Sequence, residues 1–184
     1  MPNTLTAKVN YSLRGRYTGD DAPGAQAEQF VYELAQTLTD GSGAGQADVM
    51  AHFMLEVSPY MLGGSAADPI KQFNLNAMVQ TLWGESFSRD FAKLKLLYVE
   101  HLGAQDTQIL RVGTWAAAAA DNNIWPVQTD SIIGPGDHFM LASFTDGYTV
   151  TAATDHLFYC YADATLGANY EAFDIRVIAL GVAA

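Results

Sequence analysis

Apolar and polar residues alternate along several stretches of this chain, with a period of two that is typical of β-strands. In the first stretch, polar residues separate the apolar Leu5, Ala7, Val9, Tyr11 and Leu13. The same alternation returns in Phe30, Tyr32 and Leu34. Successive side chains of a strand point to opposite faces, so each stretch predicts a half-buried strand. We expect the two strands to pair as a hairpin closed around residues 19–26.

Strand patterns continue through the rest of the chain, separated by glycine, proline and other turn residues. We predict strands within residues 49–57, 70–75, 107–115, 130–144, 146–163 and 168–181. The 130–144 segment contains a Gly-Pro-Gly corner that begins at Gly134, so it predicts a strand, a turn and a further strand. In the last segment Phe173, Ile175 and Val177 share one parity, and we expect them to face the core.

Residues 91–102 differ from these segments, because their apolar residues follow no regular alternation. A strand covered on both faces has this pattern, and so does a buried helix. Gly103 ends the segment early and the neighbouring segments are predicted strands. We therefore favour a buried strand.

Together these patterns predict an all-β fold. About eight to ten short strands with glycine-rich turns between them indicate a β-sandwich of jelly-roll type. The chain has 184 residues, a size that a single domain commonly has. We place an N-terminal strand pair or arm in residues 1–47 and the sandwich in residues 48–184, as one compact domain overall.

A glycine-rich corner with the sequence DGSGAGQAD, residues 40–48, marks the boundary between these two parts. Glycine lets backbone N–H groups approach a phosphate closely, so a nucleotide loop is the alternative to a turn. A Walker loop ends in Gly-Lys-Ser or Gly-Lys-Thr, whereas Gly45 is followed here by Gln46 and Ala47. A dinucleotide fingerprint leads into a helix, whereas this corner leads into a predicted strand. We interpret Gly43 and Gly45 as turn residues.

The net charge of −11 limits the partners that the chain can bind. From Val112 onward, eight acidic residues are accompanied by one basic residue, Arg176. Such a surface repels phosphate backbones, so we expect no direct binding of nucleic acid. The sequence has no apolar run of about 18 residues, and we expect no membrane span. Residues 1–19 show no apolar segment of a secretory signal, so we expect synthesis in a cytoplasm.

Residues with catalytic or metal-binding chemistry are dispersed along the chain. The four histidines, none of which has the spacing of a local metal motif, are His52, His101, His138 and His156. A cupin-like metal site would have to be assembled by the fold. Cys160 lies among aromatic residues, which indicates a buried and inert thiol. No G-x-S-x-G elbow occurs. We predict a protein that is not an enzyme, without catalytic residues, metal or cofactor.

Aromatic residues in predicted turns are the candidate contact residues. They are Tyr60, Trp83, Trp125 and Tyr148. Tyrosine and tryptophan anchor protein interfaces, because one part of the side chain is apolar and another part forms hydrogen bonds. A lid over the end of the sandwich is the alternative for any one of them.

The order of several segments carries a resemblance to a known family. Along the chain these segments are LTDGSGAGQAD, an apolar strand around Lys95, LRVG, IIGPGDHFML, DGYTV and YEAFDIRVIALG. This order resembles a family of small virion proteins of tailed bacteriophages, and the resemblance extends from about Thr4 to Gly181. The segment VMAHFMLEVSPYM is more apolar than the family pattern at that place. This departure bears on the surface that would bind the partner, and not on the expected fold.

The resemblance implies a capsid decoration or cement protein on the virion surface, made in the host cytoplasm. Its partners would be the major capsid protein and further copies of itself, as a homotrimer. The N-terminal strand segment would be exchanged with a neighbour, because an edge strand pairs readily with another chain. A phage tail component is the nearest alternative. Further alternatives are a carbohydrate-binding tail module with Trp83 and Trp125 as its platform, and the cupin-like metal enzyme.

Overall fold

The computed structural model describes residues 4–18, 27–57, 70–82, 85–104, 108–113, 130–152, 157–162 and 172–184. These residues form strands and turns, and they contain no helix. The strands are β1 (Ala7–Thr18), β2 (Ala27–Leu38), β3 (Val49–Val57), β4 (Ile70–Asn74), β5 (Met78–Leu82), β6 (Glu85–Arg89), β7 (Phe91–His101), β8 (Leu110–Gly113), β9 (Asp130–Ile133), β10 (His138–Ala142), β11 (Tyr148–Thr149), β12 (Leu157–Ala162) and β13 (Phe173–Ala183). The predicted all-β class is confirmed.

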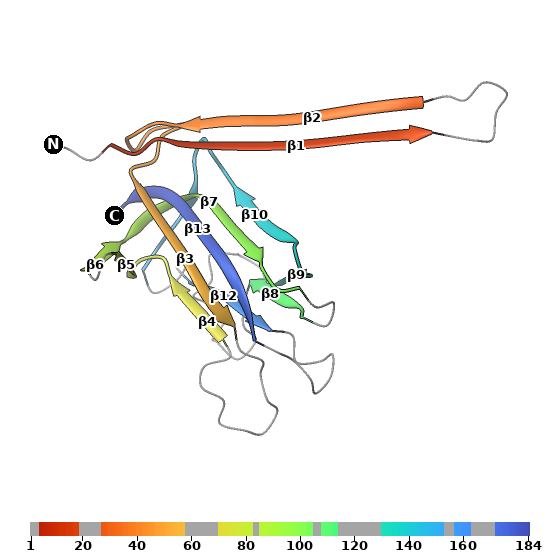
Figure 1. Ribbon diagram of the computed structural model, residues 1–184. Helices are drawn as coiled ribbons and strands as arrows, with labels where there is room; N and C mark the ends of the chain where they lie inside the picture. The colour runs from red at the N-terminus through yellow and green to blue at the C-terminus, as the bar shows by residue number, and fades with distance from the viewer. Residues whose placement is uncertain are drawn as a thin grey trace.

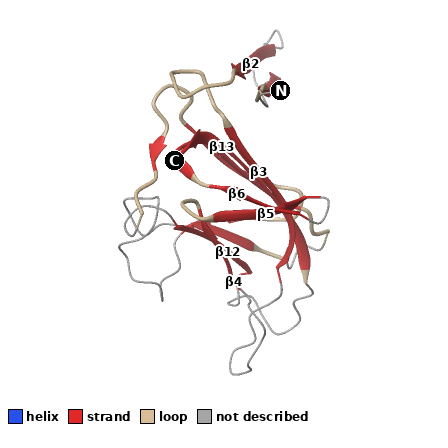
Figure 2. Ribbon diagram, turned by 90° about the vertical axis from the view of Figure 1, so that its left-hand side faces the viewer, coloured by secondary structure: helices blue, strands red, loops and turns tan. Residues whose placement is uncertain are grey.

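Two antiparallel sheets form the body of the protein (Figure 1). The large sheet has the order β10-β7-β13-β3, with β11 also paired to β7. The small sheet has the order β4-β12-β8-β9. Figure 2 shows β3 and β13 in one layer and β4 and β12 in the other. This arrangement is a β-sandwich.

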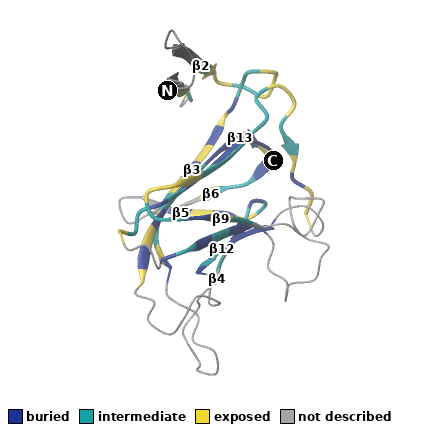
Figure 3. Ribbon diagram, turned by 90° about the vertical axis from the view of Figure 1, so that its right-hand side faces the viewer, coloured by how far each residue is buried: buried dark blue, intermediate teal, exposed yellow. Residues whose placement is uncertain are grey.

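The main core lies between the two sheets. Phe173, Ile175 and Val177 are buried in it, as their parity predicted. The rings of Phe73 and Phe158 stack with centroids 4.5 Å apart in the small sheet. Figure 3 shows the alternation of exposed and buried residues along β3. One face of each sheet is therefore buried in the core, as the period of two along the strands predicts.

The eight strands of the two sheets, apart from β11, pair in a nested order. Numbered along the chain, the first pairs with the last (β3 with β13), and the second with the seventh (β4 with β12). The third pairs with the sixth (β7 with β10), and the fourth with the fifth (β8 with β9). All four pairs are antiparallel. The body is thus one long hairpin of paired strands folded over on itself.

Strand β7 occupies the interior of the large sheet, between β10 and β13. Residues 94–97 are all buried, which explains their irregular apolar pattern. Leu180 pairs with Leu96 and Gly181 pairs with Leu94, so Lys95 is an extra residue in β7. Such a bulge redirects the side chains around it. The predicted buried strand is confirmed.

Strands β1 and β2 form a hairpin that extends from the body as an arm (Figure 1). Its register runs from Ala7 opposite Leu38 to Thr18 opposite Ala27. At its base the predicted alternation is present: Ala7 and Val9 are half-buried, and Lys8 is exposed. The N-terminal strand pair is therefore confirmed, and both strands are longer than their apolar patterns.

Two further segments differ from the sequence prediction. The hairpin β5–β6 was not predicted, because its residues show no regular alternation of apolar and polar positions. In the strand expected in residues 107–115, the described residues enter β8 only at Leu110. The expected hairpin turn at residues 19–26 lies outside the described residues.

The bulge generates a prediction at Gly181. A Cβ atom there would overlap the carbonyl oxygen of Lys93 and lie 2.7 Å from a ring carbon of Phe91. We expect Gly181→Ala to lower the free energy of unfolding by about 1–3 kcal/mol, because the crowded backbone must shift. Urea-induced unfolding followed by circular dichroism measures this difference.

Gly134→Ala provides the matched control. A Cβ atom at Gly134 would lie 3.4 Å from its nearest neighbour, an oxygen of Asp137, which is an ordinary contact. We expect this variant to stay within about 0.5 kcal/mol of the unchanged protein. Equal stability of the two variants would show that the backbone at Gly181 adapts to a side chain.

Candidate interaction surface

Residues 39–47, which we call the glycine corner, overlap the glycine-rich stretch 40–48 and close on themselves through their own backbone. The N–H of Thr39 donates to the carbonyl of Gly45 at 3.2 Å, and the N–H of Ala47 donates to the carbonyl of Thr39 at 2.8 Å. The N–H of Gly43 donates to Oε1 of Gln46 at 2.8 Å. Gly45 has a φ of 66°, a conformation that favours glycine. These N–H groups are engaged within the protein, so the corner is a turn, as interpreted from the sequence.

The corner binds to a loop of the large sheet, residues 143–147. The N–H of Gly45 donates to the carbonyl of Phe144 at 3.0 Å. Next to the corner, the N–H of Asp48 donates to the carbonyl of Gly181 at 3.0 Å. A carboxylate oxygen of Asp48 accepts from the N–H of Ala183 at 2.7 Å. The base of the arm is therefore held by the loop on one side and by the end of β13 on the other.

A buried lysine supports this loop from below. Lys95, the extra residue of the bulge, is 1% exposed. Its Nζ donates to the carbonyl of Thr145 at 2.5 Å and lies 3.5 Å from the carbonyl of Phe144. Burial lowers the pKa of Lys95, Lys93 lowers it further, and Asp146 opposes both effects. Phe144 is thus bound by Lys95 through the same carbonyl that accepts from Gly45.

Apolar contacts accompany these hydrogen bonds and form an arm-base cluster on the outside of the large sheet. Its buried members are Leu38, Ala47, Leu96 and Leu180. The half-buried residues packed on them are Leu5, Ala7, Val9, Met140, Ala142, Phe144 and Ile178. The cluster joins the arm, the glycine corner and β7, β10 and β13. It is separate from the main core between the sheets.

A groove of about 450 Å³ continues from this cluster, between β1 and the large sheet. The arm contributes residues 7–11 to its wall, among them Val9 and Tyr11. Met50, Tyr98 and Ile178 contribute from the sheet. Most of this lining is apolar or aromatic. An apolar groove at the surface is a common feature of protein-binding sites.

We call the outward side of the large sheet the outer sheet face. It consists of Met50, His52, Met54, Leu96, Tyr98, Glu100, His138, Met140, Arg176 and Ile178. Met50 is 43% exposed and Met54 is 59% exposed. Nη1 of Arg176 lies 2.7 Å from Oε2 of Glu100, and the rings of Tyr98 and His138 stack at 5.5 Å. Burial raises the pKa of Tyr98, and Glu100 raises it further. The face combines exposed methionines and aromatic rings with one ion pair.

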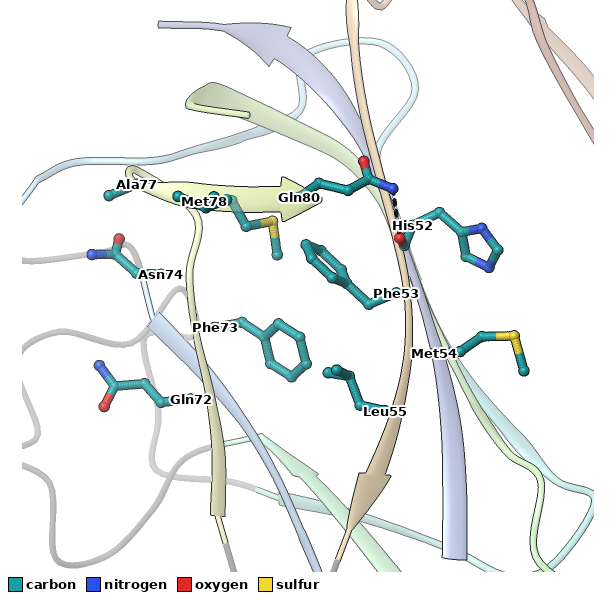
Figure 4. Close-up of a pocket in the computed structure, with 11 residues that line it drawn as sticks. His52, Phe53, Met54, Leu55, Gln72, Phe73, Asn74, Ala77, Met78 and Gln80 are labelled. Carbon is teal, nitrogen blue, oxygen red and sulfur yellow. Dashed lines mark hydrogen bonds between the residues drawn. The ribbon is translucent and has the colours of Figure 1, made fainter. Parts of the chain in front are cut away.

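A second groove of about 530 Å³ lies between β3, β4 and β5 (Figure 4). The rings of Phe53 and Phe73 meet there at a tilt, with centroids 5.9 Å apart. Nε2 of Gln80 donates to the carbonyl of His52 at 2.7 Å. This bond occupies a backbone acceptor on the outer edge of β3. The centre of that edge is therefore covered from within the chain, which hinders the addition of a foreign strand.

Of the four predicted contact residues, the described structure contains Tyr148. Tyr148 lies in β11 opposite Leu94 and is half-buried against the main core. Tyr60, Trp83 and Trp125 lie outside the described residues. Their role as contacts stays a prediction. Met50 and Met54 were not among the predicted contact residues. The outward parity of the strand at residues 49–57 could have identified them as exposed.

The histidines do not form a metal site in the part of the chain that the structure describes. No group of three or more histidine, cysteine or acidic side chains there is placed to hold an ion. His101 is buried; its Nε2 lies 2.9 Å from the carbonyl of Gln108, and its Nδ1 accepts from the N–H of Gly103 at 3.0 Å. His52 and His138 are exposed, and His156 lies outside the described residues. Burial raises the pKa of the Cys160 thiol, as an inert cysteine requires.

Comparisons with protein-family models, with curated proteins and with solved structures found no match for this chain. The described residues also contain no helix that is long and apolar enough to cross a membrane. The surface must therefore be interpreted from its own geometry.

His101 generates a prediction about acid stability. Burial lowers its pKa below the ordinary 6.5, and its Nδ1 accepts a hydrogen bond that a protonated ring could not accept. The unfolded chain therefore takes up a proton at His101 at a higher pH than the folded chain. The contribution of neutral His101 to the free energy of unfolding is fully present above pH 6.5. It is lost as the pH falls toward the folded-state pKa, by up to about 1.4 kcal/mol per pH unit.

The measurement is the free energy of unfolding between pH 5 and 8, for the unchanged protein and for His101→Gln. We expect the difference between them to shrink as the pH falls, because the variant has no proton to take up at this position. His138→Gln makes the same substitution at an exposed histidine and serves as the matched control. A His101→Gln profile that runs parallel to the unchanged protein would contradict this assignment.

Proposed function

We propose that this chain is a non-enzymatic structural protein of a tailed-bacteriophage virion, namely a capsid decoration or cement protein. It binds the lattice of the major capsid protein on the outside of the shell and stabilises it. It acts as a homotrimer, as the resemblance of its segments to small virion proteins implies. Its work is the burial of apolar surface between subunits, repeated over many copies.

The observation that carries the proposal is the arm. A two-stranded hairpin that extends beyond its own body serves contact with neighbouring molecules. It is anchored at a firmly bonded base by Gly45, Asp48 and Lys95. A rigid base directs the arm toward a fixed position in an assembly. Neither a small-molecule site nor a catalytic site needs such an extension.

Two further observations support the proposal. The nested pairing of β3 with β13 and β4 with β12 supports interpreting the sandwich as a jelly roll, an architecture that viral capsid proteins use. The net charge of −11 suits the outside of a shell whose interior holds DNA, because phosphates repel an acidic surface.

The test is mass spectrometry of purified virions separated into heads and tails, with the copies of this chain counted against the major capsid protein. We expect a high copy number in the head fraction, because a decoration protein repeats with the lattice. Recovery in the tail fraction would replace the capsid role with a tail role. Absence from both fractions would contradict the virion role altogether.

A further inference from the structure

Two Asp-Gly steps lie in the described parts of the chain, on the two sides of the junction between the arm and the body. Asp40–Gly41 belongs to the glycine corner, and Asp146–Gly147 belongs to the loop at residues 143–147 that binds the corner. Thr39 precedes the first step and Thr145 precedes the second, so the sequence Thr-Asp-Gly occurs at both places. The fold therefore has to supply most of any difference in their reactivity.

An Asp-Gly step can rearrange without an enzyme. The backbone nitrogen of the glycine attacks Cγ of the aspartic acid, so an N–Cγ bond forms and a Cγ–O bond breaks. The amide proton and the hydroxyl group leave as water, and the product is a five-membered succinimide. Water then adds to Cγ and restores aspartate, or adds to the backbone carbonyl and gives isoaspartate, whose main chain is one carbon atom longer. Glycine favours the reaction because no side chain hinders the approach of its nitrogen.

The nitrogen of Gly41 is accessible to this reaction. Gly41 is half-buried, and its N–H has no hydrogen-bond acceptor among the residues that the structure describes. Asp40 is exposed, and its Oδ1 accepts from the N–H of Leu5 at 3.0 Å. The position is also kept as glycine, because its φ is 129° and a Cβ atom there would lie 2.8 Å from Oε1 of Gln46. The corner thus combines an unbonded glycine nitrogen with an adjacent carboxyl group.

The fold restrains the nitrogen of Gly147. Its N–H donates to the carbonyl of Ser143 at 3.1 Å and to Oγ of the same residue at 3.2 Å. A Cβ atom at Gly147 would lie 3.1 Å from the carbonyl oxygen of Leu94, so this glycine packs on the backbone of β7. The hydrogen bonds must open before the nitrogen can reach the carboxyl group of Asp146. Local opening of this kind slows a reaction in proportion to its free energy.

We propose that Asp40–Gly41 is a self-modification site, where isoaspartate forms and releases Leu5 from the glycine corner, whereas the fold protects Asp146–Gly147. In isoaspartate the free carboxylate is attached to Cα, so the acceptor of the Leu5 N–H is displaced. Leu5 packs in the arm-base cluster, and the base of the arm therefore loosens as the protein ages. This inference goes beyond the proposed function and does not depend on it.

The experiment is peptide mass spectrometry of the purified full chain after incubation at neutral pH in water enriched in the heavy oxygen isotope. Each opening of a succinimide incorporates one heavy oxygen atom, and electron-based fragmentation distinguishes isoaspartate from aspartate of equal mass. We expect isoaspartate to accumulate at Asp40 at least about tenfold faster than at Asp146, because the two hydrogen bonds of Gly147 must open first. Equal rates, or a faster rate at Asp146, would overturn the inference.

The unfolded chain provides the matched control. In concentrated guanidinium chloride the two Thr-Asp-Gly sequences have no fold to restrain them, so we expect their rates to agree within about threefold. A preference for Asp40 as large as in the folded protein would assign the difference to flanking residues and overturn the protection by the fold. Conversion of Asp40 in the unfolded chain alone would show that the corner is not a site of modification.

Amide hydrogen exchange tests the effect on the arm base. Asp40→Glu keeps a carboxylate, but its longer side chain cannot form the five-membered ring. The Leu5 N–H should exchange about tenfold faster in the converted protein than in a fresh sample, because its acceptor is displaced. Incubated and fresh Asp40→Glu protein should give equal exchange at Leu5. Unchanged exchange at Leu5 after conversion of Asp40 would overturn the release of the arm base.

Discussion

A buried ammonium group holds the arm of this protein to its body. Lys95 is the extra residue of a bulge in β7, and its Nζ donates to the carbonyl of Thr145 and lies near that of Phe144. Burying a lysine is unfavourable unless polar groups surround its charge, so the carbonyls must stay in place. The carbonyl of Phe144 also accepts from Gly45, at the corner where the arm begins. The bulge, the loop and the glycine corner thus form one junction that sets the direction of the arm.

The body and the arm on either side of this junction bury apolar residues in different ways. The body buries a main core between two sheets and is stable through its own packing, with the nested strand pairs closing on Phe73, Phe158 and Ile175. The arm packs apolar residues of its base against the body, among them Leu38 and Val9. The first strand of the arm carries three basic residues, Lys8, Arg14 and Arg16, and no acidic one. In the proposed function, contacts of the arm with neighbouring molecules would add stability to the capsid lattice.

Much of the fold was predictable, because a period of two leaves a clear pattern in half-buried strands. The strand at Val49–Val57 and the core parity of Phe173 were both predicted from alternation. The hairpin β5–β6 was not, since its residues show no regular pattern. The junction could not be predicted either. Lys95 is charged and would be expected at the surface, and only the bulge opposite Gly181 explains its burial. The outer sheet face was not predicted, because methionine is usually a core residue and only the outward parity of Met50 and Met54 indicates their exposure.

The position of the arm depends most directly on Lys95, which supports the arm base. Amide hydrogen exchange of Lys95→Met, compared with the exposed Lys93→Met, tests this role. We predict that the N–H groups of Thr39, Gly45 and Ala47 exchange at least about tenfold faster in Lys95→Met. Without the hydrogen bonds of Lys95 to the loop, local opening of the glycine corner becomes easier. The amides of β13 should stay protected in both variants. Unchanged protection of the corner in Lys95→Met, with the protein folded, would contradict the claim that this lysine holds the arm in place.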